Sequence, residues 1–167
     1  GWAGTARARL ALAAAARGLP LRDLAATLIV AAADPSGLLL AHIGDGAAVA
    51  RDAEGWRALS WPDQGDHAGE TRFLTEDPPA IRTARAGPVS ALALLTDGLE
   101  RLVLDFAAET PHAPFFARMT APLAEPGPPR DPRLDAALRR WLATEAVAER
   151  SDDDRTLLLA SRPDPAR

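Results

Sequence analysis

Acidic side chains stand at three places where a short apolar segment of the sequence meets a loop. Asp45 lies between two glycines after the run 38–43, Asp97 follows the run 89–95, and the acidic triplet 152–154 precedes the run 156–160. If these runs are strands of one sheet, their ends can converge. Mg²⁺ and Mn²⁺ prefer carboxylate and water oxygens as ligands. The spacing therefore predicts a metal centre built from carboxylates.

Each of these acidic positions also has an ordinary explanation as turn chemistry. Asp-Gly is a common turn pair, and an acidic triplet is usually a solvated loop. Taken one at a time, the motifs favour a turn over a ligand, and only their combination favours a metal. A soluble α+β domain whose acidic turns merely solvate its strand ends stays as an alternative.

The three histidines give weaker signals. His42 comes one residue before the end of an apolar run, so we interpret it as a partly buried strand residue rather than a ligand. His67 and His112 fall in loop-like segments, where their positions do not favour a functional role over a structural one.

Composition narrows the chemistry further. The chain of 167 residues is 47% hydrophobic and 25% charged, which is typical of one globular domain. It contains no Cys, Lys, Tyr or Asn, so a thiolate nucleophile, a disulfide and a Schiff-base lysine are all excluded. The net charge of −4, without a basic stripe, argues against nucleic acid as a partner. Catalysis must use carboxylates, hydroxyls, histidines or a bound metal.

No segment approaches the roughly 20 apolar residues of a membrane span, so we expect a cytoplasmic protein without membrane contact. The chain starts without Met inside a helical pattern, and we therefore expect further residues before Gly1.

The first half of the sequence predicts a helix followed by strands. Ala, Leu and Arg dominate residues 5–17, and Gly18 supplies a stop. The predicted strands of this half are a hairpin at 27–33 and 38–43 and a continuing antiparallel meander at 47–51 and 56–59. Residues 61–80 predict a long surface loop with a functional role.

The second half predicts one more hairpin, helices and a closing strand. The hairpin joins 81–86 to 89–95 across Gly87-Pro88, and a helix begins near Asp97. A short helix is expected around Phe115 and Met119. Asp131 followed by Pro132 predicts the start of an amphipathic helix. Residues 156–160 form the closing strand of one domain spanning 1–161, and 162–167 are a polar tail.

These segments occur in the order seen in a known family. The relevant stretches are 41–46 (Ala-His-Ile-Gly-Asp-Gly), 95–99 (Leu-Thr-Asp-Gly-Leu) and 153–156 (Asp-Asp-Arg-Thr). Together with 69–76, 111–116 and 146–157, they resemble the type-2C (PPM) metal-dependent Ser/Thr protein phosphatases, and more narrowly their bacterial PphC-like branch. The resemblance covers about residues 10–160.

The resemblance implies an α+β fold, a four-layer α-β-β-α sandwich of two antiparallel sheets flanked by helices. It implies a binuclear Mg²⁺ or Mn²⁺ site at one end of the sandwich, with Asp97 and Asp153 as ligands of the catalytic metals. Asp45 resembles the residue that helps Asp97 to hold a third, weaker ion, and Asp154 stands where the family usually has Asn.

The function implied by the resemblance is hydrolysis of phosphoserine and phosphothreonine in proteins by a water molecule that bridges the metals. No protein nucleophile is needed. The implied partners are phosphorylated proteins and a cognate Ser/Thr kinase. Glu70 and Thr71, in the long loop, are the candidate substrate-loop residues.

The sequence also departs from the family. The N-terminal acidic motif, the Asp-Gly metal motif and the phosphate-binding Arg have no counterpart, so we expect an N-terminally incomplete domain, its C-terminal two-thirds, that is inactive alone. Residues 65–69 read Gly-Asp-His-Ala-Gly where the branch has Gly-Glu-Tyr-Ala-Asn, which changes the substrate contacts expected from this loop. A non-catalytic binding or regulatory module on the same fold, a pseudophosphatase, is the second function that the sequence allows.

Overall fold

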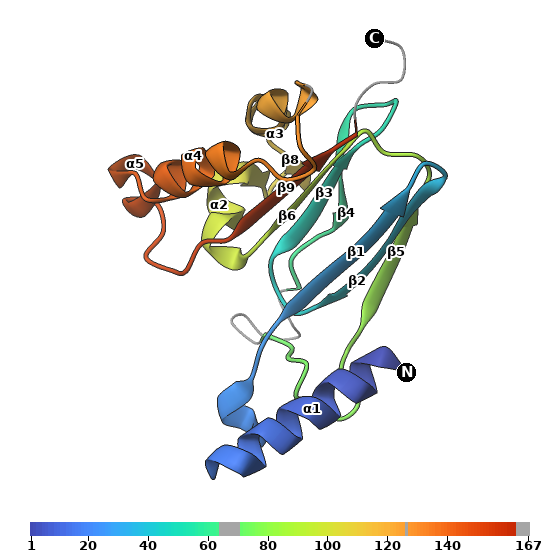
Figure 1. The fold of residues 1–167 in the computed structure, drawn as a ribbon, viewed down its shortest axis with the longest axis vertical. Helices are drawn as coiled ribbons and strands as arrows, with labels where there is room; N and C mark the ends of the chain where they lie inside the picture. The colour runs from blue at the N-terminus through green and yellow to red at the C-terminus, as the bar shows by residue number, and fades with distance from the viewer. Residues whose placement is uncertain (64–70, 126, 163–167) are drawn as a thin grey trace.

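Two antiparallel β-sheets packed face to face form the centre of the fold, and helices lie outside them (Figure 1). The computed structural model describes residues 1–63, 71–125 and 127–162. Within these residues sheet A has the strand order β1–β2–β5, with β1 at Leu28–Asp34, β2 at Gly37–Ile43 and β5 at Arg82–Ala86. Sheet B has the order β4–β3–β6–β9, with β3 at Ala47–Arg51, β4 at Trp56–Ser60, β6 at Ala91–Leu95 and β9 at Leu157–Ser161.

Small aliphatic side chains fill the space between the two sheets. Because side chains alternate along a strand, β2 turns Leu38 and Leu40 towards sheet B, where they pack in one cluster with Ala48 and Ala50 of β3. The next residue of β2 with this orientation is His42, which is fully buried. A polar ring therefore lies at the end of an otherwise apolar layer.

Helices cover the outer face of sheet B. They are α2 (Glu100–Val103), α3 (Ala113–Thr120), α4 (Pro132–Leu142) and α5 (Glu145–Ala148). Phe116 of α3 is the largest fully buried side chain and packs with Leu95 and Val103. The N-cap predicted for α4 is present, since the Asp131 carboxylate accepts a hydrogen bond from the Arg133 N–H at 2.8 Å.

The helix α1 (Trp2–Arg17) lies at one end of sheet A, on the side of the molecule away from the other helices (Figure 1). Its residues Ala3 and Leu10 contact Ile43 and Leu28, which are paired across β1 and β2. Gly18 ends the helix in the left-handed conformation with φ of 66°. The order of layers is helix, sheet, sheet, helices, and the predicted α-β-β-α sandwich is confirmed.

Two of the predicted strand pairings are wrong, although the strands themselves exist. The strands β5 and β6 do not form a hairpin, because the chain crosses from sheet A to sheet B between them and buries Val89 in the inter-sheet core. The predicted meander is also divided, since β2 belongs to sheet A and β3 to sheet B. A local apolar pattern identifies a strand but not its partner.

Short elements complete the described chain. They are the 3-10 helices η1 (Leu21–Leu24), η2 (Asp97–Leu99) and η3 (Ala121–Ala124) and the two-residue strands β7 (Leu104–Asp105) and β8 (Thr110–Pro111). Along the described residues, no helix combines the length and apolar character needed to cross a membrane.

Candidate metal centre

The register of sheet B brings the predicted acidic positions to one end of the sandwich. Ala47 at the start of β3 pairs with Leu95 at the end of β6, and Leu95 pairs with Leu157 at the start of β9. The residues just beyond this end of the three adjacent strands include Asp45, Asp97 and Asp153.

The pKa of the Asp97 carboxyl group is affected by both Asp45 and Asp153. Partial desolvation, followed by the negative charges of Asp45 and Asp153, raises the pKa of the Asp97 carboxyl group above its usual value. The Gly98 N–H donates to Asp97 Oδ1 at 2.9 Å, which opposes this shift without cancelling it. The charges of Asp45 and Asp153 therefore both act on Asp97, and a cation bound beside Asp97 would offset that repulsion.

Asp153 is held in a short exposed loop that leads into β9. Its Oδ1 accepts the Asp154 N–H at 2.7 Å. The loop passes close to Gly98, where a Cβ atom would lie only 2.5 Å from the Asp154 carbonyl oxygen. A glycine after Asp97 therefore lets the two acidic loops approach each other.

Asp45 is partly buried in the turn that links sheet A to sheet B. Its Oδ2 accepts a hydrogen bond from the Thr71 hydroxyl at 3.0 Å. Gly44 and Gly46 on either side have φ of 90° and 82°, values that residues with side chains rarely adopt. A Cβ atom at Gly46 would also meet the Leu95 carbonyl oxygen at 2.5 Å. The Gly-Asp-Gly sequence is therefore required by the path of the backbone.

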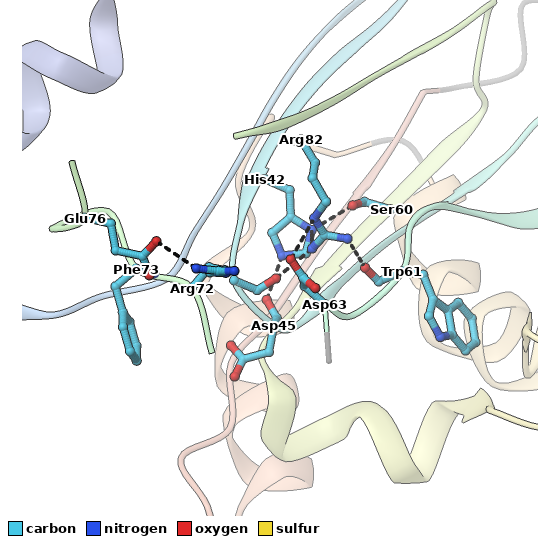
Figure 2. A network of polar contacts seen from close by, with 10 residues as sticks. His42, Asp45, Ser60, Trp61, Asp63, Arg72, Phe73, Glu76 and Arg82 are labelled. Atoms are coloured by element: carbon cyan, nitrogen blue, oxygen red, sulfur yellow. Dashed lines mark hydrogen bonds and ion pairs between the residues drawn. The ribbon is translucent and has the colours of Figure 1, made fainter. Parts of the chain in front are cut away.

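Behind Asp45 lies a polar network centred on His42 (Figure 2). His42 Nε2 lies 2.6 Å from the Asp45 carbonyl oxygen, an acceptor only, so Nε2 carries the proton. Its Nδ1 accepts from Arg82 Nη2 at 3.1 Å and lies 2.8 Å from the Ser60 hydroxyl. Burial lowers the pKa of the imidazole, which agrees with a neutral ring.

Glu100 approaches the same turn from α2. Its Oε1 accepts the Gly46 N–H at 2.7 Å. Burial, and then the charges of Asp45 and Asp97, raise the pKa of Glu100 to about 7. A fourth carboxyl group thus stands beside the three predicted ones, and near neutral pH it carries a proton part of the time.

The chemistry of this donor set fits a divalent cation, because carboxylate oxygens are the preferred ligands of Mg²⁺ and Mn²⁺. The set is not a complete site by itself. Among the residues that the structure describes, no three His, Asp or Glu side chains already converge as metal ligands. A divalent cation held by these carboxylates would need further ligands.

The remaining sequence-predicted residues have different outcomes. Glu70 and His67 lie outside the described residues. Thr71 lies within hydrogen-bonding distance of Asp45, and His42 is a strand residue as predicted, although it is fully rather than partly buried. His112 is the N-cap residue of α3, where its backbone N–H donates to the Val103 carbonyl oxygen at 2.8 Å.

Glu100 and Arg82 are two residues of this site that no sequence pattern had indicated. Glu100 follows Asp97 by one helical turn, and that spacing could have indicated that both face the same side. Arg82 gives no such signal, because its partners come from other segments of the chain: His42 is 40 residues away and Trp61 is 21 residues away.

A separate cavity of about 900 Å³ lies between α3, α4 and β9. Its lining combines apolar residues such as Met119, Leu138 and Leu159 with several arginines, and it does not include Asp45, Asp97 or Asp153. The acidic cluster is thus not part of this cavity.

A family model and a curated protein both match this chain. The family model described as protein phosphatase 2C matches residues 2–143. Serine/threonine-protein phosphatase 3 of Escherichia coli (strain K12) is 35% identical over 159 residues, which cover 93% of this chain and 63% of that protein. The chain therefore spans less than two thirds of the length of this curated relative.

Solved structures show the same fold. PppA, described as a key regulatory component of T6SS in Pseudomonas aeruginosa, aligns with a TM-score of 0.59 and 15% identity, over 94% of this chain and 65% of that one. The Ser/Thr phosphatase Stp1 of Staphylococcus aureus aligns with a TM-score of 0.51 and 16% identity, over 84% of this chain and 57% of that one. At these identities the likeness concerns the fold alone.

Proposed function

The chain belongs to the protein phosphatase 2C family, and from this premise we propose that its strand-end carboxylates form part of the cation site of a protein Ser/Thr phosphatase. The family and the fold expected from the motif order are confirmed by these matches. The proposed substrates are proteins carrying phosphoserine or phosphothreonine, produced in the cytoplasm by a cognate Ser/Thr kinase.

The observation that carries the proposal is the register of sheet B, which brings Asp45, Asp97 and Asp153 to one end of the sandwich, where the charges of Asp45 and Asp153 raise the pKa of Asp97. Like charges at one end of a sheet repel one another, and a bound cation offsets that repulsion. We assign Asp97 and Asp153 to the catalytic pair of Mg²⁺ or Mn²⁺ ions, and Asp45 with Asp97 to a third, weaker ion.

When bound, such ions supply Lewis-acid chemistry: they lower the pKa of a water molecule and polarise the oxygens of a phosphoryl group. The protein's own residues have a different task. Asp97 and Asp153 offset positive charge and set the position of the site on the rigid ends of β6 and β9. Thr71 holds the Asp45 carboxylate, and we propose that the loop of Glu70 and Thr71 also faces the substrate. No side chain of this cluster has to act as a nucleophile.

The number of ligands limits what this chain can do alone. Two hard cations need about six oxygen ligands each. Three carboxylates are too few, so we propose that residues 1–161 are the C-terminal two-thirds of a phosphatase domain, followed by a polar tail at 162–167, and that turnover requires carboxylates from elsewhere. In that case, residues 1–167 do not hydrolyse p-nitrophenyl phosphate with Mn²⁺, whereas the protein encoded by the complete gene does.

The second function that the sequence allows is that of a pseudophosphatase. A binding or regulatory module on the same fold would need no complete metal site. The same assay separates the two functions. A complete gene product that hydrolyses neither p-nitrophenyl phosphate nor a phosphothreonine peptide at any Mn²⁺ concentration would be a pseudophosphatase.

A further inference from the structure

The side chains of His42, three residues away, and Glu100, 54 residues away, hold a single peptide group, the one between Asp45 and Gly46. On one side His42 Nε2 donates to the Asp45 carbonyl oxygen at 2.6 Å, and on the other side the Gly46 N–H donates to Glu100 Oε1 at 2.7 Å. Both polar atoms of this peptide group are therefore satisfied by side chains. The orientation of the peptide plane next to the Asp45 side chain is fixed by these two contacts.

Arg82 of β5 anchors the peptide group on the other side of Asp45. Its Nη2 donates to the Gly44 carbonyl oxygen at 2.7 Å and to His42 Nδ1 at 3.1 Å (Figure 2). Its Nη1 donates to the Trp61 carbonyl oxygen at 2.6 Å, and its Nε lies 3.8 Å from Asp63 Oδ2. The Arg82 guanidinium thus contacts the turn directly at Gly44. It also orients the imidazole of His42, which donates to the Asp45 carbonyl oxygen.

The turn needs anchors of this kind because of its sequence. Gly44 and Gly46 adopt positive φ, and glycine loses more conformational freedom on folding than any other residue. A Gly-Asp-Gly segment without contacts would sample many backbone conformations, and the Asp45 carboxylate would move with them. Rigid placement of Asp45 therefore has to come from the surrounding side chains.

We propose that Arg82 and His42 are positioning residues that fix the Asp45 carboxylate for cation binding, without touching the cation themselves. The inference rests on the proposed function, in which Asp45 binds a divalent ion. A purely structural role is the competing explanation, because Arg82 also joins sheet A to the segment that follows β4 in sheet B. The two roles differ in one respect: a positioning role acts through Asp45, and a structural role does not.

A double-mutant cycle in the complete gene product separates the two roles. The dissociation constants of Mn²⁺ are measured from the electron paramagnetic resonance signal of the free ion in the wild type, Arg82→Met, Asp45→Asn and the double variant. In Asp45→Asn one class of bound Mn²⁺ ions should be lost. Arg82→Met should raise the dissociation constant of that class by about tenfold, as for other residues that orient metal ligands. In the Asp45→Asn background the same substitution should change Mn²⁺ binding by less than about twofold.

Arg85→Met is the matched control, since Arg85 lies on the same strand, carries the same charge and is exposed. Arg85→Met should leave the Mn²⁺ dissociation constant within about twofold of the wild-type value. It removes the same charge as Arg82→Met, but salt screens the charge of an exposed side chain. A second readout follows the turn without metal. Amide exchange of Gly46, measured by NMR, should be faster in Arg82→Met and unchanged in Arg85→Met.

The outcomes distinguish this inference from the proposed function. A wild type that neither binds Mn²⁺ nor hydrolyses a phosphoester would overturn both. A wild type with Mn²⁺-dependent turnover, in which Arg82→Met weakens binding equally in both backgrounds or not at all, would overturn only the positioning role. If Arg82→Met does not fold, Arg82→Lys takes its place in the cycle, because it keeps the charge but loses the two-pronged geometry of the guanidinium, and the same comparison decides.

Discussion

Thr96 and Thr156 exchange two hydrogen bonds that join the end of β6 to the start of β9. The Thr96 N–H donates to the Thr156 carbonyl oxygen at 3.2 Å, and the Thr156 N–H donates to Thr96 Oγ1 at 2.9 Å. The Thr96 hydroxyl in turn donates to the Asp154 carbonyl oxygen at 3.3 Å. This pair extends the ladder of sheet B by one residue, so the acidic loops of Asp97 and Asp153 leave the sheet side by side.

Thr96→Val tests this junction, since valine has nearly the same shape but no hydroxyl. The Thr156 N–H would lose its acceptor, and because Thr156 is exposed to water we expect a loss of only about 1 kcal/mol in the free energy of unfolding. Urea denaturation gives this value. Thr96→Ser keeps the hydroxyl and should lose less, and equal losses in both variants would show that the hydroxyl does not hold the junction.

The three aspartates of the acidic triplet 152–154 should not contribute equally to cation binding. Asp153 is the member of the triplet whose charge acts on Asp97, and successive side chains point in different directions as the chain enters β9. Asp153→Asn should therefore raise the Mn²⁺ concentration needed for half-maximal turnover far more than Asp152→Asn does. Turnover of a phosphothreonine peptide at graded Mn²⁺ is the measurement. A larger effect of Asp152→Asn would show that the register of the loop is wrong.

Glu100 should make the stability of the metal-free protein depend on pH. Its pKa is about 7 in the folded chain, raised from an ordinary value of 4.5, so the folded state binds the proton more tightly than the unfolded state does. The resulting stabilisation is fully present below pH 4.5 and is lost as the pH rises through about 7. The free energy of unfolding should therefore fall across this range because of Glu100.

The matched variant is Glu100→Gln, which keeps an acceptor for the Gly46 N–H but does not titrate. Subtracting its pH profile from that of the wild type removes the contributions of other groups. Urea unfolding at pH 5, 6, 7 and 8 supplies both profiles. Parallel profiles would mean that the Glu100 carboxyl keeps an ordinary pKa in the folded chain.

Leu158 should promote self-association of residues 1–167. In the described part of the chain β9 pairs only with β6, so its other edge presents unpaired backbone groups. Leu158 on this strand is 50% exposed, although its partner Leu94 packs in the inter-sheet core. Leu158→Lys should therefore lower the association seen by sedimentation velocity.

The control for Leu158 is Leu39→Lys. Leu39 is 54% exposed but lies on β2, which has a paired strand on both sides. It should leave association largely unchanged. An equal reduction in both variants would indicate general surface hydrophobicity rather than the open edge of β9.

Much of the fold could be predicted from the sequence, because local chemistry determines it. The strand at 47–51 is predicted with the bounds of β3, and the helix after Asp131 begins where its N-cap and Pro132 require. The pairing of strands could not be predicted in the same way. Gly87-Pro88 is typical of a hairpin turn, yet Val89 packs between the sheets and carries the chain from one sheet to the other.

In the candidate site, too, some residues could be predicted from the sequence and others could not. The three aspartates could be found because each follows or precedes a recognisable apolar run. The groups that hold them could not, since these depend on contacts between distant segments: Glu100 reaches Gly46 across 54 residues and Arg82 reaches Gly44 across 38. Nothing in the sequence near Arg82 distinguishes it from the exposed Arg85 three residues later.

Asp97 should matter more than Asp45 for catalysis, because it is assigned to both the catalytic pair and the third ion. Asp97→Asn keeps the shape of the side chain but removes a negative charge beside both the catalytic pair and the third ion. Asp45→Asn removes a charge beside the third ion only. Both variants should keep the far-UV circular dichroism spectrum of the wild type, since Asp97 is exposed and Asp45 is only partly buried.

The deciding experiment is therefore the hydrolysis of a phosphothreonine peptide by the complete gene product and its Asp97→Asn and Asp45→Asn variants at saturating Mn²⁺. We expect Asp97→Asn to lose at least about 100-fold in turnover, since removing a cation ligand costs several kcal/mol of transition-state stabilisation, and Asp45→Asn to lose clearly less. Near-normal turnover in both variants would contradict the assignment of these carboxylates to the cation site.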